Sequence, residues 1–196
     1  MKLSGFYDFR MLGLYFLCAF FSSSHAIEIA DVKVGEQIQL PGTSQTLVLN
    51  GAGIRYKFFF KVYVGALYLP EQQQDAGKIM ANDAYNRIVM HIVYDEVPKA
   101  KLVSAWQEGF ADNNSEGVMA SIKDRLQAFN DMFTDLKQGD IVLLDYLPGT
   151  GTRVNIKGQE LGVIAGADFN RALLSVWLGD EPVTEELKEA LLGLGD

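Results

Sequence analysis

The sequence predicts an α+β fold in which a large antiparallel sheet is covered on one face by helices. Strand-like runs stand before, between and after the helical segments, and the helical segments are clustered. The strand-like runs alternate apolar and polar residues, whereas the helical segments repeat apolar residues every three or four positions. No repeat, linker or low-complexity segment divides the chain, so one domain is expected over residues 27–196.

The first 26 residues are typical of a secretory signal peptide. Lys2 and Arg10 precede an apolar run over residues 11–21, and Ser24-His25-Ala26 ends in the small residues that a signal peptidase reads. The apolar run is too short for a spanning helix, so no membrane insertion is expected after cleavage. An uncleaved anchor is the alternative. We expect cleavage after Ala26 and a periplasmic protein.

Composition excludes several kinds of site and partner. Cleavage after Ala26 would remove Cys18 and His25 and leave His91 as the only histidine. This excludes a zinc site of cysteines and histidines and an iron site with two histidines, so no metal and no cofactor are expected. No Gly-x-Ser-x-Gly motif accompanies His91, which favours a structural histidine over a catalytic one. The net charge of −8, with no basic cluster beyond Arg55, Lys57 and Lys61, argues against nucleic acid and anionic membrane surfaces as partners.

The N-terminal third of the domain is predicted to form strands. They are expected over residues 27–34, 37–40 and 46–50, followed by a turn at Gly51-Ala-Gly53 and one long strand that ends at Leu69. The even positions from Tyr56 to Tyr68 are almost all apolar, whereas Arg55, Lys57 and Lys61 occupy odd positions. Successive strand side chains point to opposite faces. One face is therefore expected in the core, and the other carries cations and a phenol.

The rest of the chain is predicted to alternate between helices and strands. A short helix is expected over 72–80, a strand over 86–95, amphipathic helices around 102–110 and 119–136, strands over 141–146 and 153–157, and a helix over 167–178. Pro148-Gly-Thr-Gly-Thr152 lacks the Lys-Ser/Thr ending of a phosphate loop and is interpreted as a hairpin turn. Gly179 is placed to end the helix over 167–178, and Thr184 to cap a final helix.

Two segments of the chain resemble the chalcone isomerase family. Gly51-Ala-Gly-Ile-Arg55, followed by the run from Phe60 to Leu69, is similar to the family's opening motif. The segment from Glu160 to Gly179, a glycine-containing strand that leads into a helix, is similar to its closing motif. The resemblance implies an open-faced β-sandwich, with a cleft between a large antiparallel sheet and the helices packed on one face.

The resemblance also implies which positions of this chain correspond to the site residues of the family. In the plant isomerases, an arginine, a threonine on the next strand and a tyrosine after the middle strand position the chalcone for ring closure. Arg55 matches the arginine, whereas Val62 and Val97 stand at the threonine and tyrosine positions, and a second threonine is missing near Leu161. Because a methyl group cannot donate to a developing oxyanion, flavonoid isomerase activity is not favoured. Non-catalytic relatives bind fatty acids through an arginine, a tyrosine and an apolar cavity.

The leading hypothesis is a protein that binds a small apolar carboxylate, such as a fatty acid, through Arg55. A guanidinium makes a bidentate, charge-assisted pair with a carboxylate, and a tyrosine hydroxyl adds a third contact. Tyr63, on the same strand face, is the first candidate for that hydroxyl and Tyr94 the second. His91 and Arg87 share a face of the strand over residues 86–95, and both are expected to line the same cleft.

Other interpretations stay open at this point. Arg55 would serve an isomerase (an intramolecular lyase) on an unknown substrate as an electrophilic anchor, with a tyrosine as proton relay. The protein would otherwise be an interaction protein without a ligand. Arg55 has a structural interpretation too, in which it braces the turn by donating to backbone carbonyls. Lys57 and Lys61 also have a structural interpretation, as cations that keep a sheet edge soluble.

Overall fold

The periodic patterns of the chain produce eleven strands and five helices in the computed structural model, which describes residues 26–195. In chain order they are β1 (Ala26–Ile29), β2 (Val32–Gly35), β3 (Gln37–Gln39), β4 (Thr46–Lys57), β5 (Phe60–Leu69), α1 (Ala76–Ala81), β6 (Asn86–Ile92), β7 (Glu96–Val97), α2 (Lys99–Asn113), α3 (Glu116–Asp131), β8 (Leu136–Lys137), β9 (Ile141–Leu147), β10 (Gly151–Ile156), β11 (Gln159–Ile164), α4 (Ala167–Leu178) and α5 (Glu185–Leu191). The predicted signal peptide lies outside the described residues, apart from Ala26.

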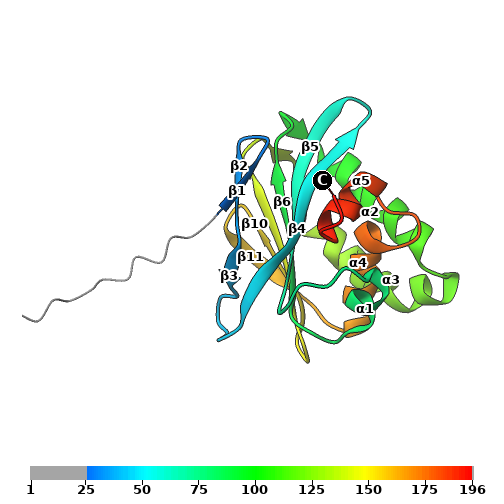
Figure 1. Ribbon diagram of the computed structural model, residues 1–196. Helices are drawn as coiled ribbons and strands as arrows, with labels where there is room; N and C mark the ends of the chain where they lie inside the picture. The colour runs from blue at the N-terminus through cyan, green and yellow to red at the C-terminus, as the bar shows by residue number, and fades with distance from the viewer. Residues whose placement is uncertain (1–25, 196) are drawn as a thin grey trace, which may run out of the picture.

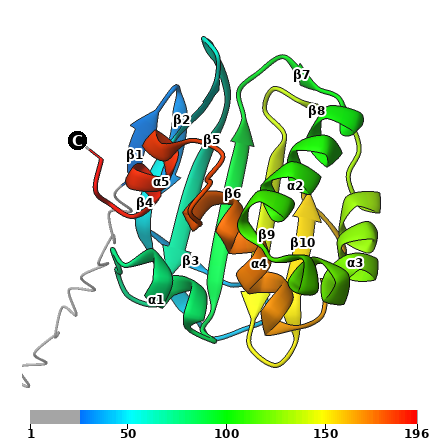
Figure 2. The same ribbon diagram turned by 90° about the vertical axis from the view of Figure 1, so that its right-hand side faces the viewer.

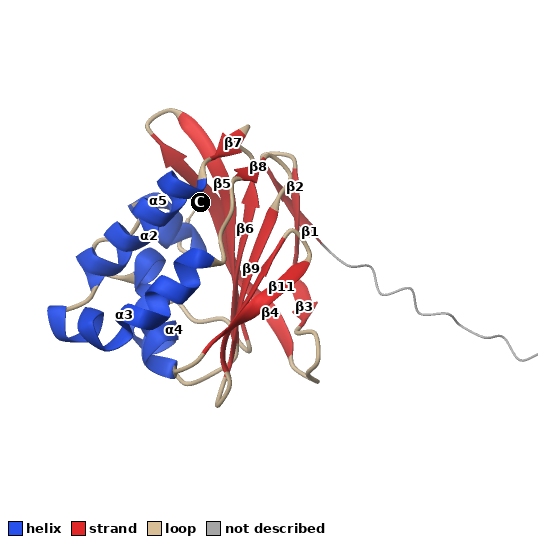
Figure 3. Cartoon of the chain, turned by 180° about the vertical axis from the view of Figure 1, so that it is seen from behind, coloured by secondary structure: helices blue, strands red, loops and turns tan. Residues whose placement is uncertain are grey.

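Seven strands form one antiparallel sheet in the order β11-β10-β9-β6-β5-β4-β3. The five helices cover one face of this sheet, so that helices and strands form separate layers (Figures 1 and 3). The larger apolar core lies between the two layers and contains the aromatic residues of α2, α3 and α4. This arrangement confirms the predicted α+β fold with helices on one face. Within residues 26–195, no helix combines the length and apolar character needed to cross a membrane.

The opposite face of the sheet carries a second, smaller core. The β1–β2 hairpin lies against this face (Figure 1), and Val34 packs with Leu40, Leu47 and Val64. Both faces of β5 and β6 are therefore buried, with alternate side chains entering different cores.

The prediction of a single long strand up to Leu69 is wrong, because the chain reverses at Phe58 and Phe59. β4 and β5 form an antiparallel hairpin around these two residues, with Arg55 opposite Tyr63. Phe58 has a φ of +55°, a conformation that glycine, asparagine and aspartate usually supply in short hairpins. The turn therefore lacked the residues by which a sequence normally indicates a hairpin.

The glycines at positions 51 and 53 were predicted to form a turn, but both lie inside β4. Helix α5 packs directly on this part of the strand. A Cβ atom at Gly51 would clash with the carbonyl oxygen of Ala190, and one at Gly53 would lie 2.5 Å from the Cβ of Ala190. The two glycines thus allow a helix to approach the strand closely.

The strand expected over 27–34 is instead the β1–β2 hairpin, because the chain turns at Ala30 and Asp31. Most other predicted elements are confirmed, with shifts at their ends. Helix α4 has the predicted bounds, and Gly179 ends it by donating its backbone N–H to the carbonyl of Ser175. The hydroxyl of Thr184 caps α5 by accepting the N–H of Leu187. The Pro148 segment joins β9 to β10 as a hairpin. The helix expected over 72–80 is shorter, and the strand expected over 86–95 ends at Ile92.

Candidate ligand-binding site

A cavity of about 360 Å³ opens between the ends of β4, β5 and β6 and helices α2 and α4. In Figure 2, α2 and α5 lie in front of the sheet, with β5 and β6 visible between them. The cavity is lined by Arg55, Lys57, Phe58, Phe60, Val62, Tyr63, Met90, Ile92, Tyr94, Glu96, Val97, Pro98, Lys101, Leu102, Ala105, Trp106, Val176 and Val183. Most of these side chains are apolar. The volume lies within the range of small-molecule sites, towards its lower end.

Arg55 projects from β4 on the helical side of the sheet and lines the cavity. It is half-buried. Its guanidinium takes part in none of the hydrogen bonds or ion pairs found within residues 26–195. If Arg55 braced the turn, its guanidinium would donate to backbone carbonyls. No such bond from Arg55 is found within residues 26–195. Arg55 is thus a cation in an apolar wall that has its donors available.

Tyr63 lies opposite Arg55 on the neighbouring strand and is 5% exposed. Its hydroxyl oxygen accepts a hydrogen bond of 2.8 Å from Nε1 of Trp177. Because the oxygen is the acceptor in that bond, the hydroxyl hydrogen is left to donate to another group. Burial raises the pKa of Tyr63 to about 12, although the nearby charge of Arg55 and the bond from Trp177 lower it in part. The phenol is therefore protonated at neutral pH.

Tyr94 lies at the mouth of the cavity, in the segment after β6. It is 38% exposed, and its ring packs edge-on against Phe60 with ring centroids 5.6 Å apart. The structure thus brings Arg55, Tyr63 and Tyr94 to one cavity, with Tyr63 in the interior and Tyr94 at the entrance.

His91 does not line the cavity, contrary to the expectation from the sequence. Along β6, Met90 and Ile92 face the helices, so His91 faces the opposite side of the sheet, across from Val64. Burial lowers the pKa of His91 below its ordinary value. Its position is consistent with a structural histidine.

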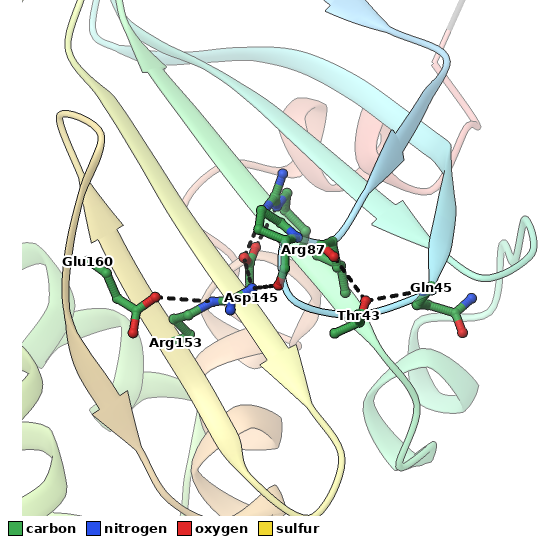
Figure 4. A network of polar contacts seen from close by, with 8 residues as sticks. Thr43, Gln45, Arg87, Asp145, Arg153 and Glu160 are labelled. Carbon is green, nitrogen blue, oxygen red and sulfur yellow. Dashed lines mark hydrogen bonds and ion pairs between the residues drawn. The ribbon is translucent and has the colours of Figure 1, made fainter.

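Arg87 shares the face of His91 and belongs to a polar network on that side of the sheet (Figure 4). It donates from Nη2 to Oδ2 of Asp145 at 2.7 Å, and Arg153 donates to the same oxygen at 3.1 Å. Glu160 approaches Nε of Arg153 at 3.9 Å. Arg87 is therefore occupied in a buried ion pair and does not reach the cleft.

Several contributors to the cavity were not recognised in the sequence. Trp177, in the helix predicted over 167–178, does not line the cavity but fixes the hydroxyl of Tyr63 through its indole N–H. A buried tryptophan usually needs an acceptor for its indole N–H, so a polar partner of Trp177 could have been expected from the sequence. Lys101 and Ala105 of α2 line the cavity one turn apart. Phe58 and Phe60 were expected in the core but lie at the cavity mouth, 85% and 57% exposed.

The cavity offers few hydroxyl groups for acid–base chemistry. Val62 and Val97, the residues at the positions where the resemblance implies a threonine and a tyrosine, both line the cavity. Both valines contribute methyl groups, and no hydroxyl group, to the wall of the cavity. Within residues 26–195, no group of three or more histidine, cysteine, aspartate and glutamate residues is arranged to hold a metal ion.

Comparisons with known proteins agree with the observed fold. A family model described as chalcone isomerase-like matches residues 26–193. The crystal structure of a fatty-acid binding protein from Arabidopsis thaliana is similar to this chain, with a TM-score of 0.69 and 17% sequence identity. That alignment covers 86% of this chain and 96% of the plant protein. A search among curated proteins found no match.

Proposed function

Since the chain belongs to the chalcone isomerase-like family, we propose that it binds a small apolar carboxylate, such as a fatty acid, and does not catalyse a reaction. The cavity between β5, β6 and α2 holds the apolar part of the ligand. Arg55 pairs with the carboxylate, and Tyr63 donates its hydroxyl hydrogen as a further contact. The structural neighbour named as a fatty-acid binding protein supports this proposal.

The observation that carries the proposal is the guanidinium of Arg55, which lines an apolar cavity without a bond to any described residue. A half-buried cation is stabilised by an anion that pairs with it, because the pair offsets the loss of hydration. A carboxylate fits the planar guanidinium in a bidentate pair. The apolar lining then favours a carboxylate attached to a hydrocarbon chain.

Tyr63 adds selectivity for an acceptor at the same end of the cavity. Its oxygen is fixed by Trp177, so the direction of its free hydrogen is restricted. Its pKa of about 12 keeps this hydrogen in place over the physiological pH range. A ligand with a carboxylate at Arg55 therefore meets a second, neutral donor from the neighbouring strand.

Catalysis by ring closure receives less support than binding. Each donor that stabilises a developing oxyanion contributes about 2.7–4 kcal/mol to the transition state. Val62 and Val97 supply no such donor in this cavity. We therefore expect no turnover of a chalcone by the wild-type protein.

A titration with dodecanoic acid, read by displacement of a fluorescent fatty acid, tests the proposal. Arg55→Gln should weaken binding about tenfold or more, because a charge-assisted bidentate pair is lost. Arg55→Lys should fall between wild type and Arg55→Gln, because it keeps the charge and loses the planar fork. Lys61→Gln is the matched control, since Lys61 is an exposed cation of the same hairpin and does not line the cavity. Equal affinity of wild type and Arg55→Gln would refute the anchoring role.

We also propose that the protein is exported to the periplasm and cleaved after Ala26. The pattern of residues 1–26 supports this, with cations, an apolar run and small residues in the order of a signal peptide. The intact mass of the protein from a periplasmic extract tests it. The expected mass is that of Ile27–Asp196, and a cell-associated chain that keeps residues 1–26 would refute cleavage.

A further inference from the structure

The turn between β4 and β5 exposes more aromatic surface than any other described segment. Phe58 is 85% exposed, Phe59 is 95% exposed and Phe60 is 57% exposed, and Tyr56 beside them is 42% exposed. We refer to residues 56–61 as the hairpin tip. The hairpin extends beyond the rest of the sheet at the top of Figure 1, so these rings lie at an extremity of the molecule. Contiguous exposed apolar side chains usually mark an interaction site.

The hairpin tip is continuous with the cavity. Lys57, Phe58 and Phe60 line the cavity mouth, while the same two phenylalanine rings are largely exposed. Tyr94 packs against Phe60 from the other side of the mouth. Whatever covers the tip therefore also covers the entrance of the cavity.

Cations gather around these rings, although the chain as a whole is acidic. Lys57 and Lys61 flank the three phenylalanines directly in the sequence. The cavity lining carries Arg55, Lys57 and Lys101 against a single acid, Glu96. Across the chain, by contrast, 25 acidic residues outnumber 17 basic ones. The tip thus combines aromatic rings with a local positive charge.

This combination fits the surface of a phospholipid bilayer. Phenylalanine rings enter the boundary between headgroups and acyl chains, and flanking lysines are attracted to anionic headgroups. The three rings offer at most about 600 Å² of surface, which is below the ~800 Å² that each partner contributes to a stable protein interface. A bilayer needs no such matched surface.

We propose that the hairpin tip docks on a phospholipid bilayer that contains anionic lipids, which brings the cavity mouth to the membrane surface. An apolar ligand then passes between the bilayer and the cavity without crossing water. The passage of the ligand rests on the proposed function, whereas the docking does not. Vesicle binding without added fatty acid therefore tests the docking separately.

The test is co-sedimentation with vesicles of phosphatidylethanolamine and phosphatidylglycerol, compared with phosphatidylcholine alone. Wild type should bind the vesicles that contain phosphatidylglycerol. The double variant F58S/F59S should lose about tenfold or more in vesicle affinity, because it removes two rings that enter the bilayer when the tip docks. K57Q/K61Q should lose about thirtyfold in affinity for anionic vesicles, and much less for phosphatidylcholine, because each lysine contributes about 1 kcal/mol at an anionic surface. Every protein is compared in the same processed form, so a contribution of the N-terminal residues would be common to all.

V118S/L194S is the matched control, because both residues are exposed apolar side chains of other segments, Val118 in α3 and Leu194 after α5. It should bind vesicles like wild type. Melting temperatures verify that each variant is folded, as expected for substitutions of exposed residues. Absence of vesicle binding by wild type, or equal binding by wild type and F58S/F59S, would overturn the proposal. A dimer of wild type that F58S/F59S dissociates, without vesicle binding, would assign the tip to a second copy of the chain instead.

Discussion

Trp177 on α4 donates its indole N–H to the hydroxyl oxygen of Tyr63 on β5, over 2.8 Å and inside the buried core. This bond joins the helical layer to the sheet at the wall of the cavity. It satisfies a buried donor of Trp177, and it directs the remaining hydrogen of Tyr63. Stability and ligand recognition are therefore linked at one residue.

Replacement of Tyr63 by phenylalanine should lower both stability and ligand affinity. The indole N–H of Trp177 would then be buried without an acceptor, which costs about 1–3 kcal/mol. Urea unfolding should show this loss, and titration with dodecanoic acid should show weaker binding. Tyr94→Phe is the control for the loss of stability, because Tyr94 is 38% exposed and its hydroxyl takes part in no hydrogen bond found within residues 26–195. Unchanged stability of Tyr63→Phe would mean that the bond to Trp177 contributes nothing.

Alkaline pH should destabilise wild type more than Tyr63→Phe. An unfolded tyrosine ionises near its ordinary pKa of about 10, whereas Tyr63 in the folded state keeps its proton up to about pH 12. The unfolded state therefore loses this proton first, and the contribution of Tyr63 to stability declines as the pH rises through that interval. Unfolding free energies at several alkaline pH values, compared between the two proteins, measure the difference. Parallel curves would contradict the raised pKa.

Gly51→Ala should destabilise the protein strongly by displacing α5. The added Cβ would clash with the backbone carbonyl of Ala190, which cannot rotate away as a flexible side chain can. A loss of about 1–3 kcal/mol or more is expected from overpacking of this kind. Gly35→Ala provides the comparison, because its nearest non-neighbouring atom would lie 3.6 Å away, an ordinary contact. Thermal unfolding of the two variants should therefore differ by several degrees, and equal melting temperatures would argue against the close packing of α5 on β4.

Asp145→Ala should cost far more stability than Glu160→Ala, although both carboxylates contact Arg153. Asp145 is buried between Arg87 and Arg153 (Figure 4), so its loss leaves the buried guanidinium of Arg87 without its anion and removes the nearer carboxylate from Arg153. Loss of one partner from a buried ion pair typically costs about 3–5 kcal/mol. The side chain of Glu160 is 57% exposed and 3.9 Å from Arg153, so its removal should change stability by at most about 1 kcal/mol. Chemical denaturation of both variants checks this order.

The sequence was sufficient to predict the layers of the fold and most of its elements. Helix α4 follows from the apolar spacing over residues 167–178, with Gly179 as a stop signal. The Pro148 hairpin follows from its turn residues. Such local patterns are reliable because the spacing and the turn chemistry act over only a few neighbouring residues.

The hairpin at Phe58–Phe59 was not predictable from the same rules. A phenylalanine at positive φ gives no turn signal, and the alternation of apolar residues continues through it from one strand to the next. The glycines at 51 and 53 carried a misleading signal. Glycine serves a turn and a close helix contact equally well, and only the position of α5 distinguishes the two roles.

The candidate site was predicted in part, for a related reason. The motif indicated Arg55 and the strand pattern indicated Tyr63, and both residues line the cavity. His91 was assigned to the wrong face of β6, because both faces of that strand are buried. Alternation separates two faces of a strand but does not say which of them meets the helices. That choice depends on β1 and β2, which are distant in the sequence.

A native mass spectrum of the purified protein, with and without Arg55→Gln, tests the central claim most directly. After incubation with dodecanoic acid, wild type should carry the added mass of one fatty acid, and Arg55→Gln should carry little or none. Lys61→Gln should behave like wild type. An unliganded mass for wild type under these conditions, or the same bound mass in wild type and Arg55→Gln, would contradict the claim that Arg55 anchors a small apolar carboxylate.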